Sequence, residues 1–282
     1  MPTESKPKDL RADDIVLSHF TLARHHDITE RLDAAAAAGC NAVGIYIGDH
    51  QRLEAEGTAS QLPAMLDQRG LCLSEIDALR LQADPATRPT ADAVEAEEAA
   101  LRIADEFECR SLHALAPPTG TTADIARAYG DLCDRAAEHG LAVALEFMPT
   151  TAVATAAEAR RIVEAADRPN AGICVDAWHH HRGADDLAQI RALPGELIVD
   201  VQLSDGPLVP AATDYGEDTR RNRLPPGEGE MDLRAFIEAI RSTGTTAPWA
   251  LEVCNEAAWE TDGADFVTHC AEGLRQLLTK AT

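Results

Sequence analysis

The chain has 282 residues, with 48 Asp and Glu against 25 Lys and Arg, which gives a formal net charge of −23 at pH 7. An acidic excess of this size, spread along the chain, opposes binding to nucleic-acid phosphates and to anionic membranes, so neither partner is expected. The polar start, MPTESKPKDLRADD, lacks a signal-peptide segment, and no apolar run approaches the roughly 18 residues of a membrane helix. A cytoplasmic protein is expected. The widely spaced cysteines contain no CxxC pair, which predicts reduced thiols.

Short apolar runs typical of buried strands recur along the chain. They cover residues 15–20, 42–47, 71–79, 111–116, 141–147, 171–175, 197–203 and 249–253. Amphipathic, mostly Ala-rich segments follow them and are expected to be helical, over residues 28–38, 59–68, 91–107, 123–139, 155–166, 184–193, 232–242 and 265–278. Gly39, Gly70 and Gly140 are the expected stops of three of these helices.

Strict alternation of strands and helices predicts an α/β fold, a single (β/α)8 TIM barrel, in which active sites lie at the carboxyl ends of the strands. A doubly wound open sheet is the rival fold, and the absence of a GxGxxG turn after the first strand counts mildly against it. We expect one barrel domain over residues 13–282, preceded by a flexible N-terminal segment over residues 1–12.

Polar residues inside apolar strands are costly unless something satisfies them, so ionisable groups at strand ends are informative. Such residues end or nearly end strands five to eight, namely Glu146, Asp176, Gln202 and Glu252. At one mouth of a barrel, the three carboxylates would repel one another unless they are protonated or bridged by a cation. The oxygen donors suit Mg²⁺ or Mn²⁺ better than Zn²⁺ or Cu²⁺. For each residue alone, a capping or salt-bridged structural role is the alternative.

Adjacent histidines follow Asp176, in the segment AWHHH. Neighbouring side chains point in different directions, so one ion is not expected to collect all of them. His179, just beyond the strand, is the expected functional histidine, and His180 and His181 are interpreted as loop residues. The long connection over residues 204–230 contains RRNRLPPGEG, which favours a lid that carries an arginine to an oxyanion or carboxylate. A solvated basic loop is the alternative.

At these residues the sequence resembles the sugar phosphate isomerase/epimerase superfamily, the xylose-isomerase-like TIM barrels, over nearly its whole length. The resemblance implies one divalent ion, Mg²⁺ or Mn²⁺ with Co²⁺ as a further candidate, held by Glu146, Asp176, Gln202 and Glu252. The D-x-x-H motif of the family corresponds to Asp176 and His179. Its R-x-x-P-G-x-G motif is similar to the segment RLPPGEG that begins at Arg223, and Arg221 is the second candidate for this arginine.

The resemblance also implies abstraction of a proton next to a carbonyl, in a small keto polyol or keto acid. Family members usually have His at the position of Gln202, whereas some 3-dehydroshikimate dehydratases have Gln there with similar spacings, which favours a dehydratase-like lyase. In that reaction His179 is the base and Arg223 orients a carboxylate or oxyanion. In the alternative, a ketose 3-epimerase or aldose–ketose isomerase, Glu146 and Glu252 are both metal ligands and the acid–base pair.

Further candidates for substrate binding are His19, Glu75 and His113 on strands one, three and four, and Arg221. A hydrogen-bonded structural role is the alternative for the first three. The superfamily also resembles apurinic endonucleases with a histidine-rich three-zinc cluster, which the acidic charge and the lack of spare histidine ligands disfavour. A non-catalytic metabolite-binding homologue is another alternative, and it could lack metal. Assembly into a homo-oligomer is an expectation from the family alone.

Overall fold

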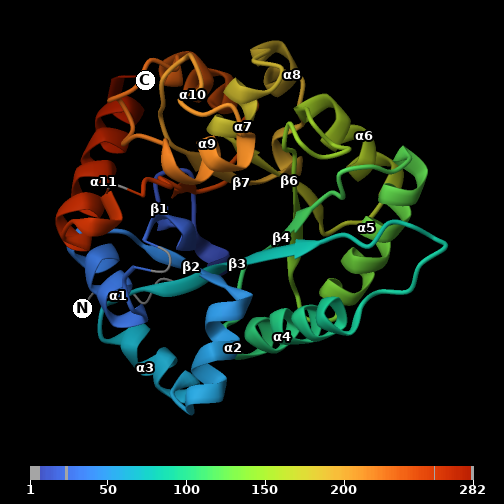
Figure 1. The fold of residues 1–282 in the computed structure, drawn as a ribbon, viewed down its shortest axis with the longest axis horizontal. Coiled ribbons are helices and arrows are strands. Elements are labelled where there is room, and N and C mark those ends of the chain that lie inside the picture. The colour runs from blue at the N-terminus through green and yellow to red at the C-terminus, as the bar shows by residue number, and fades with distance from the viewer. Residues whose placement is uncertain (1–6, 23–24, 257, 281–282) are drawn as a thin grey trace.

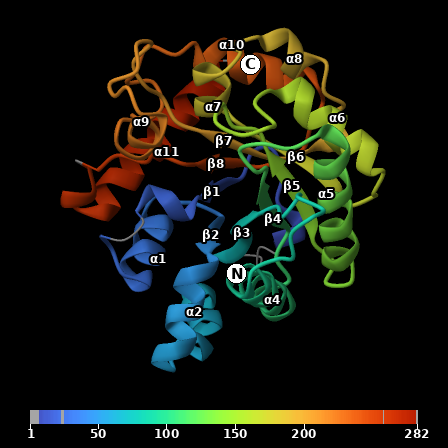
Figure 2. The ribbon, with the colours of Figure 1, turned by 45° about the vertical axis from the view of Figure 1, so that its right-hand side comes forward.

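The computed structural model describes residues 7–22, 25–256 and 258–280. Its parallel strands close into a barrel in chain order, and the first strand pairs with the eighth. The strands are β1 (Ile15–Leu17), β2 (Ala42–Tyr46), β3 (Cys72–Arg80), β4 (Ser111–Leu115), β5 (Ala142–Glu146), β6 (Ala171–Asp176), β7 (Ile198–Leu203) and β8 (Trp249–Leu251). Helices surround this barrel (Figure 1), and the view turned by 45° shows them on its outer side as well (Figure 2). The predicted (β/α)8 TIM barrel is confirmed.

Every predicted helix has a counterpart among the described residues. The α-helices are α1 (Ile28–Ala37), α2 (Ile47–Glu56), α3 (Leu62–Asp67), α4 (Ala91–Phe107), α5 (Thr122–Ala137), α6 (Ala156–Ala166), α7 (Ala177–Arg182), α8 (Leu187–Arg191), α9 (Tyr215–Arg221), α10 (Leu233–Ser242) and α11 (Gly263–Lys280). The expected stops Gly39, Gly70 and Gly140 have φ of 67°, 65° and 68°, the left-handed conformation that glycine adopts at little cost.

Threonine residues cap the amino ends of helices α4, α5 and α6. The hydroxyl groups of Thr90, Thr121 and Thr155 each accept a hydrogen bond from the backbone N–H three residues later. An N-cap of this kind satisfies one of the backbone donors that a helix start leaves free, and it is typically worth about 1 kcal/mol. The sequence therefore fixes where these helices start, and with them the lengths of the loops that precede them.

Three helices lie where the sequence predicts none. Helices α2 and α7 begin directly after strands, and α9 lies in the long connection over residues 204–230. Helix α2 follows β2 without a loop, so Ile47, expected to end the strand, is the first residue of a helix whose buried side chains Ile47, His50 and Leu53 recur every third position. Helix α7 begins directly after Asp176, whose carboxylate accepts a hydrogen bond from the backbone of Trp178 at 2.6 Å. The interpretation of His180 and His181 as loop residues is therefore wrong, because both lie in this helix.

The amino end of the barrel interior is apolar. Leu10 packs there with Val16, Ala42, Cys72 and Ala250, and it is buried although it precedes the first strand. Residues 7–9 form a 3₁₀ helix with Pro7 buried, so this part of the segment expected to be flexible packs against the barrel, whereas residues 1–6 lie outside the described residues.

Towards the carboxyl ends of the strands the interior becomes polar. On β7 the inward-pointing positions are Asp200 and Gln202, and their partners on β6 are Cys174 and Asp176. Two levels of polar side chains result, one at the carboxyl-terminal mouth and one two residues earlier along the strands.

Every cysteine of the chain is buried and free. None of the described helices is long and apolar enough to cross a membrane.

Candidate active site

Four buried side chains from consecutive strands meet at the mouth, and we call them the mouth site. They are Glu146 at the end of β5, Asp176 at the end of β6, Gln202 near the end of β7 and Glu252 directly after β8. The amide nitrogen of Gln202 donates to Oε1 of Glu252 at 3.2 Å, and the hydroxyl of Ser18 donates to the same oxygen at 3.2 Å. Parallel strands bring these residues together because their carboxyl ends share one rim.

Arg223 lies inside this ring of carboxylates. Its Nη1 is 2.9 Å from Oδ2 of Asp176 and 2.8 Å from Oε2 of Glu252, and the side chain is 3% exposed. Its Nη2 donates to the hydroxyl of Thr219 at 3.0 Å. Burial alone would raise the pKa of Asp176, but Arg223 and then His179 hold it below its usual value. The guanidinium therefore supplies the positive charge that keeps Asp176 ionised in a buried position.

His179 connects the mouth site to the long seventh connection. Its Nε2 lies 3.0 Å from Oε1 of Glu146 and 3.5 Å from Oδ2 of Asp176. Its Nδ1 is hydrogen-bonded to the hydroxyl of Tyr215, the first residue of α9. Because one ring nitrogen is held by Tyr215, the other is directed at the carboxylates. Tyr215 is not among the residues predicted from the sequence. Asp214 before it is a typical helix N-cap, which would have placed Tyr215 at the start of a helix.

Two buried aspartates fix the long connection that carries Tyr215 and Arg223. Asp205 accepts hydrogen bonds from the backbone N–H groups of Gly206, Gly227 and Met231. Asp218 in α9 accepts from Nε of Arg182 at 2.8 Å and from the backbone of Ala211 at 3.0 Å. The connection is thus an ordered strap with a helix of its own.

Gly229 lies where this strap returns to its base. A Cβ on Gly229 would lie 2.2 Å from Oδ1 of Asp205 and 2.4 Å from the backbone nitrogen of Gly206. The close approach of the two backbone segments therefore requires a residue without a side chain at this position.

The remaining predicted residues lie in three different places. His19 is buried at the rim, where its Nδ1 is 3.0 Å from Nη1 of Arg31 and its ring stacks on Tyr46 at 5.4 Å. Glu75 and His113 lie in the deeper polar level. Arg221 is half exposed and pairs with Glu217 and Glu256, so it lies apart from the mouth site.

His180 and His181 also lie apart from the mouth carboxylates. His180 is buried against Phe236, with 5.7 Å between the ring centroids, and burial lowers its pKa to about 4. Nδ1 of His181 is hydrogen-bonded to the carbonyl of Ala177. Trp178 is fully buried and packs under two guanidinium groups, with Arg182 4.2 Å and Arg223 5.4 Å from its ring. It therefore holds Arg223 in place.

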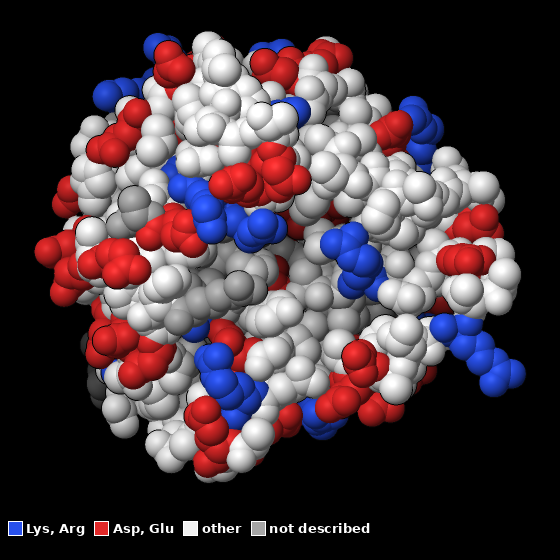
Figure 3. Space-filling view, in the orientation of Figure 1, with Lys and Arg blue, Asp and Glu red and all other residues white. Residues whose placement is uncertain are grey.

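The mouth residues fit a divalent metal ion. Oε1 of Gln202 is buried and has no hydrogen-bond partner among the described residues, which leaves it available as a ligand. Ligand atoms of Glu146, Asp176 and His179 lie within 4.8 Å of one another. Carboxylate and amide oxygens are typical ligands of Mg²⁺ and Mn²⁺. The face of the molecule that carries α9 has a hollow near its centre, with acidic atoms inside and Lys or Arg side chains on its rim (Figure 3).

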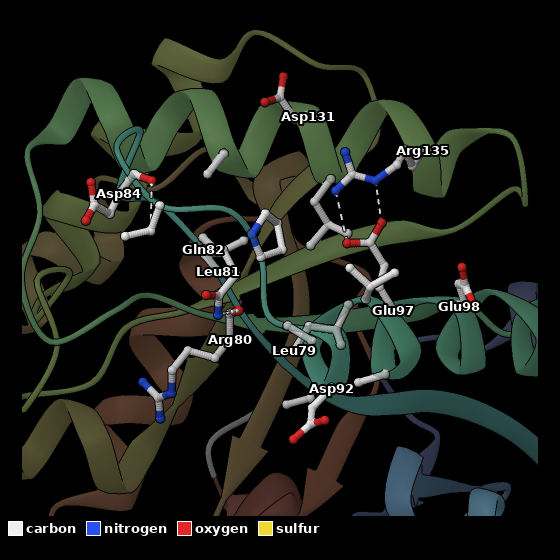
Figure 4. A pocket seen from close by; sticks show the side chains of 18 of the residues that line it. Leu79, Arg80, Leu81, Gln82, Asp84, Asp92, Glu97, Glu98, Asp131 and Arg135 are labelled. Carbon is white, nitrogen blue, oxygen red and sulfur yellow. Dashed lines mark hydrogen bonds and ion pairs between the residues drawn. The ribbon is translucent and has the colours of Figure 1, made fainter.

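A large cavity lies elsewhere, on the outer side of the barrel wall. It has a volume of about 760 Å³ and lies between the end of β3, α4 and α5. Two ion pairs lie on its wall, Arg135 with Glu97 (Figure 4) and Arg127 with Asp131. No residue of the predicted site lines this cavity, so its size does not make it the candidate active site.

Comparison with known proteins places this geometry in a family. A family model described as xylose isomerase-like TIM barrel matches residues 32–270. A 3-dehydroshikimate dehydratase of Pseudomonas aeruginosa is 28% identical over 263 residues, which cover 92% of this chain and 40% of the dehydratase. An inosose isomerase of Bacillus subtilis is 30% identical over 116 residues, which cover 40% of each protein. The matched region therefore makes up 40% of the length of each of these curated relatives.

Solved structures support the same fold. The 1.8 Å crystal structure of the IOLI protein with a bound zinc atom superposes with a TM-score of 0.85 and 17% identity, over 95% of this chain and 99% of that one. The relatives found by sequence are enzymes, a dehydratase and an isomerase. The match of the family model over most of the chain, together with the closed barrel, shows that this protein belongs to the xylose isomerase-like TIM barrel family.

Proposed function

We propose that this protein is a lyase that depends on Mg²⁺ or Mn²⁺ and dehydrates 3-dehydroshikimate or a closely similar cyclic keto acid. The reaction removes a proton from the carbon next to the ketone and a hydroxyl group from the following carbon, and water leaves. When held by Glu146, Asp176, Gln202 and Glu252, the metal supplies Lewis-acid polarisation of the substrate carbonyl, which makes the neighbouring proton easier to remove.

The observation that carries the proposal is the unequal environment of the possible proton carriers. Oε1 of Glu252 accepts hydrogen bonds from Ser18 and Gln202, and its Oε2 is paired with Arg223. Such a carboxylate is held as a ligand and is poorly placed to exchange protons. His179 presents one ring nitrogen to the mouth while Tyr215 holds the other. A single base beside the metal ligands suits an elimination, which needs one proton removed.

Charge at the mouth supports an acidic substrate. Arg223 is buried within the mouth site, and basic side chains lie on the rim of the hollow in Figure 3. In a chain with a net charge of −23, basic side chains at the entrance favour the approach of a carboxylate. The match to the Pseudomonas aeruginosa dehydratase over 92% of the chain supports the same substrate class.

The second candidate function is epimerisation or isomerisation of a ketose or an inosose. The Bacillus subtilis inosose isomerase favours it, because this relative is 30% identical over the region matched. In that reaction Glu146 and Glu252 exchange protons on opposite faces of the substrate. Such a role requires a Glu252 carboxylate that is free to take up and release a proton. In the structure Oε2 is paired with Arg223 and Oε1 accepts from Gln202, which ranks this function second.

The test is an assay of the chelator-stripped protein with and without Mn²⁺. Metal-dependent appearance of an aromatic product from 3-dehydroshikimate, followed by its ultraviolet absorbance, is the expected result. A panel of ketoses and inososes in D₂O, followed by NMR, tests the second function. Deuterium incorporation into a ketose or inosose without aromatisation would show an epimerase or isomerase instead of a lyase. No reaction in either assay, with metal bound, would overturn both candidate functions.

A further inference from the structure

Beneath the mouth site lies a second group of ionisable side chains, Glu75 and Asp77 of β3, His113 of β4 and Asp200 of β7, which we call the deep cluster. Each of them is at most 2% exposed. Asp200 precedes the mouth residue Gln202 by two positions on β7, so its Cα lies about 7 Å further from the mouth along the strand. The interior of such barrels is usually filled by branched apolar side chains, so charges at this depth require a partner.

His113 is oriented as a metal-binding histidine would be. Its Nδ1 lies 2.8 Å from Oδ1 of Asp77, and its Nε2 lies 3.1 Å from Oδ2 of Asp200. With an ion bound at Nε2, a carboxylate beside Nδ1 would orient the ring, the usual arrangement around histidine ligands. Without an ion, Nε2 is hydrogen-bonded to Asp200. Two ligands about 2.1 Å from one ion lie about 3.0 Å apart at right angles and about 3.4 Å apart in a tetrahedral zinc site, and the 3.1 Å between Nε2 and Oδ2 falls within this range.

The carboxylate of Glu75 is an independent indication that the deep cluster binds an ion. Both of its carboxylate oxygens are buried, and neither has a hydrogen-bond partner within the part of the chain that the structure describes. Ligand atoms of Glu75, His113 and Asp200 lie within 4.8 Å of one another, so the unpartnered carboxylate is directed at the other two. A buried carboxylate without a partner is costly, and an ion between these three groups would remove that cost.

A divalent cation would neutralise the net negative charge of the deep cluster. Three carboxylates, those of Glu75, Asp77 and Asp200, face one guanidinium, because Nη1 of Arg110 lies 2.7 Å from Oδ1 of Asp200. With His113 neutral, two negative charges remain. Two protons, one on Glu75 and one on His113, are the alternative. Burial, and then the Asp200 carboxylate, raise the pKa of Glu75 well above its usual value, and although burial alone would lower the pKa of His113, Asp77 and then Asp200 raise it. A divalent ion and a pair of protons therefore make different, measurable predictions.

We propose that Glu75, His113 and Asp200 form a second, deeper site for a divalent transition-metal ion, and that Asp77 orients His113 from behind. The mixed nitrogen and oxygen donors suit Zn²⁺, in contrast to the oxygen donors of the mouth site. The proposal does not depend on the reaction catalysed at the mouth, because the two groups share no ligand.

The test counts zinc ions per chain. Chelator-stripped protein is dialysed against buffered micromolar Zn²⁺, and bound metal is measured by elemental analysis. We expect two ions in the wild type, one in Glu252→Ala and one in Glu75→Gln, and none in the double variant. The exposed Glu98→Gln on α4 is the matched control for the loss of one carboxylate, and it should keep two ions.

Two further measurements keep the test decisive if Glu75→Gln fails to fold. Asp77→Asn retains all three ligands, and it should weaken binding of one ion by about 10–100-fold, since it loosens the histidine. Pulsed EPR of Mn²⁺ bound to His179→Asn should show coupling to an imidazole nitrogen, which His113 provides. One ion in the wild type that is lost in Glu252→Ala, together with no nitrogen coupling in His179→Asn, would show that the deep cluster holds protons instead.

Discussion

Nη1 of Arg223 lies 2.8 Å from Oε2 of Glu252, inside the ring of side chains that the sequence predicts as metal ligands. The same nitrogen contacts Asp176 at 2.9 Å, so two of the three carboxylates share the single positive charge of one guanidinium. A metal ion and Arg223 therefore share these carboxylates, and the charge of each should influence how tightly the other is held.

Arg223→Ala should destabilise the metal-free protein by about 3–5 kcal/mol, because breaking a buried ion pair leaves the remaining charges uncompensated. Adding Mn²⁺ should restore much of this stability. Urea unfolding in chelator and in Mn²⁺ measures both effects, and the exposed Arg234→Ala is the control, expected to change stability by less than about 0.5 kcal/mol. Equal loss with and without Mn²⁺ would contradict the idea that metal and arginine share the carboxylates.

His179→Asn should lower kcat by about 10²–10⁴-fold while metal content stays unchanged, because proton transfer by a positioned base contributes this much. Tyr215→Phe removes the hydrogen bond to Nδ1 of His179 and should lower kcat by about tenfold with little change in KM. Steady-state kinetics with metal analysis checks both variants. A His179→Asn enzyme with wild-type turnover would remove the histidine from the mechanism.

His180 should make the protein less stable in mild acid. Its pKa is lowered from 6.5 to about 4 by burial, so between these values the unfolded chain binds a proton that the folded protein does not. Stability should thus be full above pH 6.5 and fall by about 2–3 kcal/mol as the pH approaches 4. Urea midpoints from pH 7 to pH 5 should fall less steeply in His180→Leu than in the wild type or in the exposed His269→Leu. Parallel pH profiles for all three proteins would contradict this assignment.

Tyr129→Phe should destabilise the barrel wall by about 1–3 kcal/mol. The fully buried hydroxyl of Tyr129 on α5 donates to the carbonyl of Val143 at 2.7 Å and accepts from the backbone nitrogen of Gly172 at 2.9 Å. Phenylalanine fits the same space but leaves both backbone groups without this partner. Thermal unfolding measures the loss, and an unchanged midpoint would mean that water replaces the hydroxyl.

The sequence predicts the barrel and the mouth residues for one physical reason. Each of Glu146, Asp176 and Glu252 interrupts an apolar run where a strand ends, and parallel strands bring such ends together without any knowledge of register. The surroundings of Glu75 and the partners of His113 could not be predicted this way. Whether His113 meets Asp77 and Asp200 depends on strand register and barrel closure, which a single sequence does not specify.

Tyr215 and Arg223 show a second limit. Both reach the mouth from a connection whose course is set by the backbone hydrogen bonds of Asp205 and Asp218, residues that look like ordinary loop aspartates in the sequence. Helix α2 shows a third limit, since a strand and a helix that join without a loop leave no turn residues to mark the boundary.

The most direct test of the central claim is the rate of aromatic product formation from 3-dehydroshikimate by the wild type and Glu146→Gln, each stripped of metal and then given Mn²⁺. The account predicts that stripped wild type is inactive, that Mn²⁺ restores its activity, and that Glu146→Gln stays at least about 10³-fold slower at the same Mn²⁺ concentration. Turnover that persists in chelator, or a Glu146→Gln enzyme with wild-type activity, would contradict a metal-dependent lyase at this mouth.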